Sequence, residues 1–126
     1  MNTKAKSGRR CDLGDIYFRS SWEANWARYL NFLIKHGEIK SWEFEPKTFW
    51  FEKIKRGVRS YCPDFMITRN DGTQFFQEVK GYMDARSATK LKRMKKYHPE
   101  WEVELIDKVR YGAIKRQLSK ILSGWE

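Results

Sequence analysis

The sequence predicts a single α/β domain in which helices flank a mixed β-sheet, with the element order α-β-β-β-β-α-β-α. Three observations carry this prediction. The chain of 126 residues suffices for one packed core and is too short for two ordinary domains. Apolar residues recur at helical spacing in some segments and alternate in others. A strand–helix–strand step near the end implies a crossover connection, so the sheet is expected to be mixed.

The N-terminal segment is basic, contains glycine and shows no apolar period. We therefore expect a basic flexible arm over residues 1–18, followed by a single domain over residues 19–126. Two interpretations of the arm stay open. It is either a solubilising tail or a nucleic-acid contact made through Arg9 and Arg10.

Residues 20–36 carry one apolar stripe at the helical period, which predicts the first helix. Gly37 stands where a C-terminal cap belongs. The stripe falls at positions i, i+4, i+7, i+8, i+11 and i+12 and consists of Trp22, Trp26, Tyr29, Leu30, Leu33 and Ile34.

Four strands are expected next. Residues 39–45 alternate loosely, and residues 48–54 are rich in aromatic and β-branched side chains, as strands are. Residues 46–62 as a whole have the pattern of a hairpin. A third strand is expected to start at Val58 or Tyr61 and to end at Thr68.

The turn Asn70-Asp71-Gly72 is a strong hairpin signal, so the fourth strand, over 73–80, is expected to return beside the third. Residues 86–97 then form a basic helix with a thin apolar line, and Pro99 stops it. Residues 101–106 alternate and predict a fifth strand. The last helix is expected over 109–122.

The candidate chemistry lies in the fourth strand. Side chains alternate along a strand, so Glu78 and Lys80 share one face, and Asp64 on the partner strand can approach Glu78 if the register allows it. Two converging carboxylates repel each other, and a hard divalent ion such as Mg²⁺ resolves the repulsion with oxygen ligands. A lysine beside that ion can position or deprotonate a water, which indicates metal-assisted attack on a phosphodiester.

Each piece of this pattern has an ordinary alternative. A Glu-x-Lys sequence on a strand is a common surface ion pair, and a Pro-Asp sequence is a common turn. Their combination, in order and in a basic chain, favours the catalytic interpretation. Glu23 on the first helix is a third candidate acid, although Ser20 and Glu23 also fit a capping box, which alone would explain the glutamate.

The charge balance indicates a polyanionic partner. The chain has 26 Lys and Arg against 16 Asp and Glu, a formal charge of +10, and its pI is about 9.7. No apolar run approaches the roughly 18–20 residues that a membrane span needs, so no membrane is expected. Cys11 and Cys62 are the only cysteines, which favours a reducing, intracellular setting.

The second predicted helix concentrates basic residues without a neighbouring acid. Such a run either tracks nucleic-acid phosphates or forms a solvated face, and the missing acids favour phosphate contact. The basic positions are Arg86, Lys90, Lys92, Arg93, Lys95 and Lys96.

Taken together, these motifs resemble the PD-(D/E)xK nuclease superfamily. The resemblance rests on Glu23 in the first helix, Pro63-Asp64, Glu78-x-Lys80 and the order of the elements. The phrases Phe18-Arg19-Ser20-x-x-Glu23 and His98-Pro99-Glu100 make the chain most similar to the phage endonuclease I family of Holliday junction-resolving enzymes. The resemblance spans about residues 18–107 and implies a restriction-endonuclease-like core.

The resemblance implies a Mg²⁺-dependent DNA endonuclease that leaves 5′-phosphate ends, with Mn²⁺ as a substitute ion. Asp64, Glu78 and the Val79 carbonyl would bind the metal, and Glu23 would help to hold a second ion or its water. Lys80 would orient the attacking water, and Arg19 would join the nucleic-acid contacts. A homodimer, branched DNA as substrate and a phage-encoded enzyme in the cytoplasm of a bacterial host also follow from the resemblance.

Three alternatives stay open at this stage. The chain could nick or cut plain duplex, or cleave transposon ends, as related nucleases do. It could be a non-catalytic nucleic-acid-binding module with the same fold. An RNA substrate is also compatible with the sequence.

Overall fold

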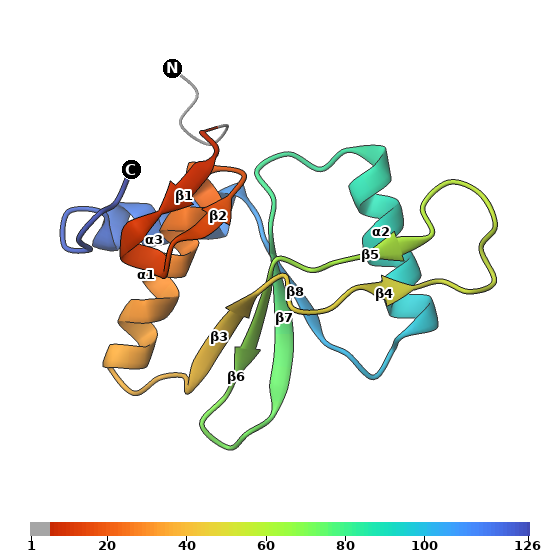
Figure 1. The fold of residues 1–126 in the computed structure, drawn as a ribbon, viewed down its shortest axis with the longest axis horizontal. Helices are drawn as coiled ribbons and strands as arrows, with labels where there is room; N and C mark the ends of the chain where they lie inside the picture. Colours follow the sequence, from red (N-terminus) through yellow and green to blue (C-terminus); the bar gives the residue numbers. More distant parts are fainter. Residues whose placement is uncertain (1–5) are drawn as a thin grey trace.

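The computed structural model describes residues 6–126 and shows a mixed α/β protein, in which a four-stranded sheet stands between helices (Figure 1). The strand order is β3-β6-β7-β8. β6 pairs antiparallel with both β3 and β7, whereas β7 and β8 are parallel, so the predicted mixed sheet is confirmed. The strands are β3 (Ser41–Phe44), β6 (Phe65–Thr68), β7 (Gln74–Val79) and β8 (Val103–Ile106).

Three helices cover the sheet. α1 (Ser21–Lys35) and α3 (Lys108–Leu118) lie against one face, and α2 (Ala85–Tyr97) lies on the other side (Figure 1). At each N-terminus a Ser or Asp side chain accepts a hydrogen bond from the backbone amide three residues on, which fixes where the helix begins. The first two helices match their predicted ranges closely, and α3 ends four residues before the predicted residue 122.

The sheet separates two apolar clusters, and strand alternation assigns each side chain to one of them. Phe65 and Phe75 belong to the cluster beneath α1. Phe76, the next residue of β7, belongs to the cluster beneath α2, where it joins Met94. β7 is therefore buried on both faces, which holds its C-terminal end firmly in place.

A separate two-stranded hairpin packs beside α2. β4 (Phe49–Trp50) pairs antiparallel with β5 (Ser60–Tyr61), which confirms the hairpin expected over 46–62. The single third strand predicted from residue 58 or 61 is wrong, because the chain leaves the strand between β5 and β6. Pro63 lies in that gap, and proline lacks the N–H that a continuous ladder needs.

The expectation of a flexible arm is wrong for residues 8–18. These residues form a β-hairpin, with β1 (Gly8–Arg10) and β2 (Ile16–Phe18) joined by the short helix η2 (Cys11–Leu13). Leu13 and Phe18 are buried in the main core, and the Phe18 ring centroid lies 4.5 Å from that of Phe44. Residues 1–5 of the predicted arm lie outside the described residues.

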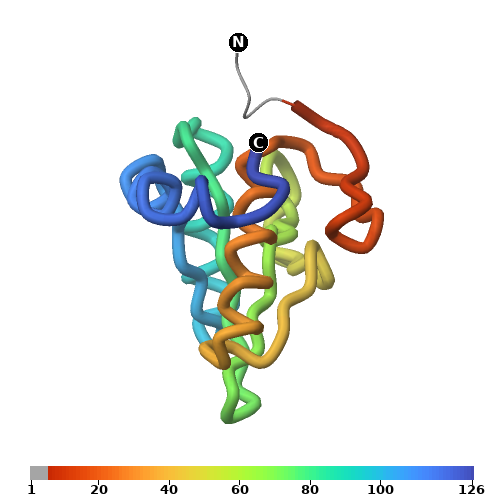
Figure 2. The backbone as a smooth tube through the Cα atoms, turned by 90° about the vertical axis from the view of Figure 1, so that its left-hand side faces the viewer, coloured from red at the N-terminus to blue at the C-terminus, as the bar shows by residue number. Residues whose placement is uncertain are grey.

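The C-terminal segment crosses the N-terminal part of α1 (Figure 2). The Asn25 amide joins it there, since its Nδ2 donates to the Glu126 carbonyl and its Oδ1 accepts from the Glu126 amide, each at 3.0 Å. None of the helices formed by residues 6–126 has the length and apolar character needed to span a lipid bilayer.

Candidate active site

An acidic cluster lies where β6 begins and β7 ends. The antiparallel register pairs Phe65 with Gln77, so the next step places Asp64 opposite Glu78. The Asp64 amide donates to Glu78 Oε1 at 3.3 Å, and the Val79 amide donates to Asp64 Oδ2 at 2.8 Å. The two carboxylates that the sequence singled out therefore meet on neighbouring strands.

Burial makes this pair electrostatically costly. Asp64 is only 3% exposed, and burial, together with the nearby charges of Glu78 and Glu23, raises its pKa well above the ordinary value. Burial also raises the pKa of Glu78, although hydrogen bonds from Tyr61 and from the Asp64 amide work against that rise. The cluster accordingly favours either a bound proton or a nearby cation.

Tyr61 of β5 completes the surroundings of Glu78. Its hydroxyl donates to Glu78 Oε1 at 2.8 Å, and burial beside that carboxylate raises the pKa of the tyrosine. The sequence alone does not predict this contact. The spacing of Tyr61 before Pro63 carries no motif, and only the folding of β5 against β7 brings the two side chains together.

Glu23 lies in the first turn of α1 and also faces the acidic cluster. Its backbone amide donates to Ser20 Oγ at 3.2 Å, as a helix cap requires, and its Oε1 accepts from the Arg19 amide at 2.9 Å. The side chain is also buried, and burial is the main cause of its raised pKa. Because its charge acts on both Asp64 and Glu78, it belongs to the acidic cluster as well as to the cap.

Lys80 follows β7 directly and borders the cluster. Its amide donates to the Ile106 carbonyl at 3.0 Å, and its ammonium lies 4.0 Å from Asp84 Oδ2. Its charge works against the rise in the pKa of Glu78. Lys80 lines a cavity of about 330 Å³ shared with Glu23, and a smaller one of about 40 Å³ shared with Glu78.

Two further charged residues sit at the edge of the cluster. The guanidinium of Arg19 binds Glu45 through two hydrogen bonds of 2.6 and 3.1 Å. Its Nη2 atom also lies 3.9 Å from Glu23 Oε2 and 3.9 Å from Asp64 Oδ1. The sequence analysis did not identify Glu45, because a single glutamate before a proline carries no signal of its own.

The basic residues predicted to bind nucleic acid divide into two groups. The predicted nucleic-acid contact of Arg10 is wrong. Its side chain is 9% exposed and forms a 2.7 Å ion pair with Glu126, which leaves it unavailable to a phosphate. Arg9 donates to the Asp15 carbonyl within the N-terminal hairpin. Arg93 of α2 is held by the Val58 carbonyl. The remaining α2 positions are exposed or half-buried, and they are Arg86, Lys90, Lys92, Lys95 and Lys96.

A sequence profile of the family described as "Protein of unknown function (DUF1064)" matches residues 4–113. The chain belongs to that family. No curated protein and no solved structure matches the chain. The matched part of this DUF1064 family member contains the acidic cluster, Lys80, Arg19 and all of α2, so the site lies within the segment that defines the family.

The donor set of the cluster suits a hard cation. Carboxylate and carbonyl oxygens are the ligands that Mg²⁺ and Mn²⁺ take, and the raised pKa values show that added positive charge would be favourable here. Among residues 6–126, however, no three His, Cys, Asp or Glu side chains are already arranged as a metal site. Asp64 and Glu78 are thus a two-carboxylate core, and Arg19 supplies the nearest guanidinium charge.

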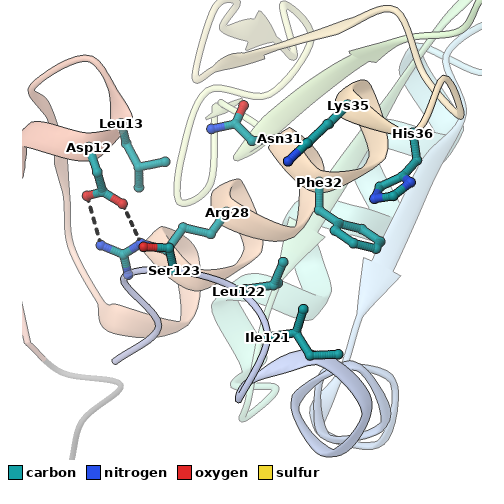
Figure 3. Close-up of a pocket in the computed structure, with 10 residues that line it drawn as sticks. All are labelled: Asp12, Leu13, Arg28, Asn31, Phe32, Lys35, His36, Ile121, Leu122 and Ser123. Carbon is teal, nitrogen blue, oxygen red and sulfur yellow. Dashed lines mark hydrogen bonds and ion pairs between the residues drawn. The ribbon is translucent and has the colours of Figure 1, made fainter.

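A third cavity lies away from this cluster and has a different character. It measures about 460 Å³ and lies between η2, α1 and the C-terminal segment (Figure 3). Its acid, Asp12, forms two hydrogen bonds with Arg28, and apolar residues such as Phe32 and Leu122 line much of the rest. The single acid in this cavity of the DUF1064 chain is already paired with Arg28, so the acidic cluster remains the better candidate for chemistry.

Proposed function

We propose that this DUF1064 family member is a divalent-metal-dependent DNA endonuclease with a restriction-endonuclease-like core of the PD-(D/E)xK type. The observation that carries the proposal is the pairing of the buried Asp64 with the half-buried Glu78 opposite it, with Lys80 two residues further along. A pair of like charges largely removed from solvent is expensive to maintain, and functional sites are where such perturbed groups concentrate. The ordinary alternatives, a surface ion pair and a turn, leave the burial of Asp64 beside a second carboxylate unexplained.

Each residue has a defined role in this proposal. Asp64, Glu78 and the Val79 carbonyl hold Mg²⁺ or Mn²⁺, with Glu23 close enough to influence the same charge. When bound, the ion supplies positive charge to the carboxylates and to the phosphoryl oxygens. The Lys80 ammonium, which lines a cavity beside Glu23, orients the attacking water and stabilises negative charge that develops at phosphorus. Hydrolysis then leaves a 5′-phosphate and a 3′-hydroxyl.

The basic residues of α2 supply the DNA contact. Lys90 lines the same small cavity as Glu78 and Lys80, which places the side of α2 that carries Arg86 and Lys90 next to the acidic cluster. Lysine and arginine contacts to phosphates position DNA without reading its sequence. This arrangement supports recognition of DNA shape, and we propose branched DNA as the substrate and a homodimer as the active form, as in the phage endonuclease I family.

One observation favours a second candidate, a nicking or duplex-cutting enzyme. The β4–β5 hairpin occupies the segment that links exchanged strands in that family, and here it packs within its own chain. Phe49 and Phe51 are buried with Met94 of α2, so the hairpin has no need of a second subunit to cover it. A protomer without strand exchange is compatible with cutting at a single site.

A cleavage assay tests both candidates. The chain is incubated with a four-way junction, a flap, a nicked duplex and a linear duplex of shared sequence, each with Mg²⁺ or Mn²⁺ and with end labels that report the termini. We expect the junction and flap to be cut fastest, whereas equal cutting of linear duplex would support the second candidate. Binding without cleavage on every substrate would instead identify a non-catalytic module.

Variants connect the activity to the cluster. Asp64→Asn, Glu78→Gln and Lys80→Ala should each lower the cleavage rate by about 10²-fold or more, because each removes a group that acts on charge in the transition state. DNA affinity measured without divalent ions should change little. Glu102→Gln is the control, since Glu102 is exposed and pairs with Arg69 outside the cluster. Parental cleavage rates in all three cluster variants would refute the assignment.

A further inference from the structure

Arg19 stands at the edge of the acidic cluster in a position that a metal-ligand role does not explain. Its Nη2 atom lies 3.9 Å from Glu23 Oε2 and 3.9 Å from Asp64 Oδ1, so one guanidinium neutralises part of the charge of two buried carboxylates. The side chain itself is 57% exposed, so it borders solvent on one side and the cluster on the other. These contacts place a solvent-accessible positive charge beside the proposed metal ligands.

Glu45 fixes that position. Its carboxylate binds the Arg19 guanidinium through both oxygens, a planar two-bond geometry that arginine favours. Its backbone amide donates to the Asp64 carbonyl at 2.7 Å, and its φ of 49° lies in the left-handed region that a residue with a Cβ rarely adopts. The chain therefore accepts local strain to hold the Glu45 backbone directly against Asp64.

We propose that Arg19, held by Glu45, is an internal counter-ion of the acidic cluster that competes with the divalent ion, and that it turns to a DNA phosphate once the ion is bound. The inference rests on the proposed function. Two cations near the same carboxylates repel each other, so the ion weakens the hold of the cluster on Arg19. A phosphate that draws Arg19 outward must, by thermodynamic reciprocity, tighten ion binding by the same factor.

The competing explanation is purely structural. In that case Arg19 and Glu45 only fasten the start of α1 to the end of β3, and loss of either partner would disturb the cluster in the same direction. The counter-ion role predicts opposite directions. Removing the Arg19 charge leaves the carboxylates short of positive charge, whereas removing the Glu45 charge frees Arg19 to act on them more strongly.

Calorimetric titration of the DNA-free protein with Mn²⁺ separates the two explanations. We expect Arg19→Gln to bind Mn²⁺ about fivefold or more tightly than the parent, a change at the lower end of typical coupling between sites. Arg19→Lys, which keeps the charge, should stay near the parent, and Glu45→Gln should bind Mn²⁺ more weakly. Arg69→Gln is the matched control, because Arg69 forms a comparable ion pair with Glu102 away from the cluster. Thermal unfolding of each variant verifies that it is folded.

The second measurement is DNA affinity with and without Ca²⁺, with the DNA verified as intact. The gain in affinity that Ca²⁺ gives the parent should shrink about fivefold in Arg19→Gln and persist in Arg19→Lys. Equal Mn²⁺ affinity in the parent and Arg19→Gln, or shifts of the same sign in Arg19→Gln and Glu45→Gln, would overturn the counter-ion role alone. Absence of Mn²⁺ binding from both the parent and Arg19→Gln would overturn the proposed function with it.

Discussion

Asp64→Asn should make the metal-free protein more stable while it abolishes cleavage. Asp64 is nearly completely buried, and its charge stands beside that of Glu78. Asparagine has almost the same volume and keeps an oxygen that can accept the 2.8 Å hydrogen bond from the Val79 amide. The substitution therefore removes the repulsion and leaves the packing and the backbone contact in place.

The size of the effect follows from the contacts of Asp64. Two unit charges about 4 Å apart repel each other by about 4 kcal/mol at an effective dielectric constant of about 20, which sets the scale for Asp64 beside Glu78. Arg19 opposes this from 3.9 Å, but its side chain is 57% exposed, so solvent limits that attraction to about 1 kcal/mol. The charged hydrogen bond from Val79 returns about 1.5 kcal/mol. The remaining gain for Asp64→Asn is about 1–2 kcal/mol, which raises the Tm by about 3–10 °C for a chain of this length.

Thermal unfolding across pH, with and without Mg²⁺, measures this prediction. The pKa values of Asp64 and Glu78 are raised in the folded state, so the unfolded chain releases these protons first as the pH rises above about 4. The metal-free parent should consequently lose stability as the pH rises from about 4 to the raised pKa values of the folded state, and Asp64→Asn should lose less. Mg²⁺ at about a hundred times its Kd should stabilise the parent by about 2.7 kcal/mol and the variant by far less. A lower Tm for Asp64→Asn at pH 8 without metal would show that the electrostatic reasoning is wrong.

Three further predictions follow from other contacts. Tyr61→Phe removes the hydroxyl that donates a hydrogen bond to Glu78 and should lower the free energy of unfolding by about 1–2 kcal/mol. An unchanged urea midpoint of unfolding would contradict this. Arg10→Ala removes one of the two arginine partners of Glu126 and leaves the 2.9 Å ion pair with Arg28, so it should cost about 1.5–3 kcal/mol without altering DNA affinity; a loss of affinity would restore Arg10 as a DNA contact. The double variant Arg86→Gln and Lys90→Gln should reduce the slope of log affinity against log salt by about 1.8, whereas a parental slope would show that DNA does not contact this side of α2.

Local patterns were sufficient to predict much of this structure. The apolar stripe of the first helix and the turn at Asn70-Asp71-Gly72 are signals between near neighbours, and both correspond to observed elements. The pairing of Asp64 with Glu78 follows from the same turn, because a tight hairpin fixes the register of its strands. The site geometry was predictable where it depends on one hairpin.

Contacts between distant segments were not predictable in this way. The N-terminal hairpin contains too few apolar residues to show a period, and it folds because Phe18 finds Phe44 and Phe65 elsewhere in the chain. Arg10 looks like any basic residue of an arm until Glu126, 116 positions later, pairs with it. The role of Glu45 likewise becomes recognisable only in the fold, because the pairing of β3 with β6 brings its backbone to Asp64.

The turn between β6 and β7 is a suitable labelling site for measurements of DNA binding and oligomeric state. It lies at the far end of the sheet from the acidic cluster, and both of its strands run the full distance between the two (Figure 1). Lengthening an exposed turn costs mainly loop-closure entropy, which grows slowly with length. A short peptide carrying a fluorophore, grafted between Asn70 and Gly72, would therefore report on tumbling and complex formation without touching the chemistry at the opposite end.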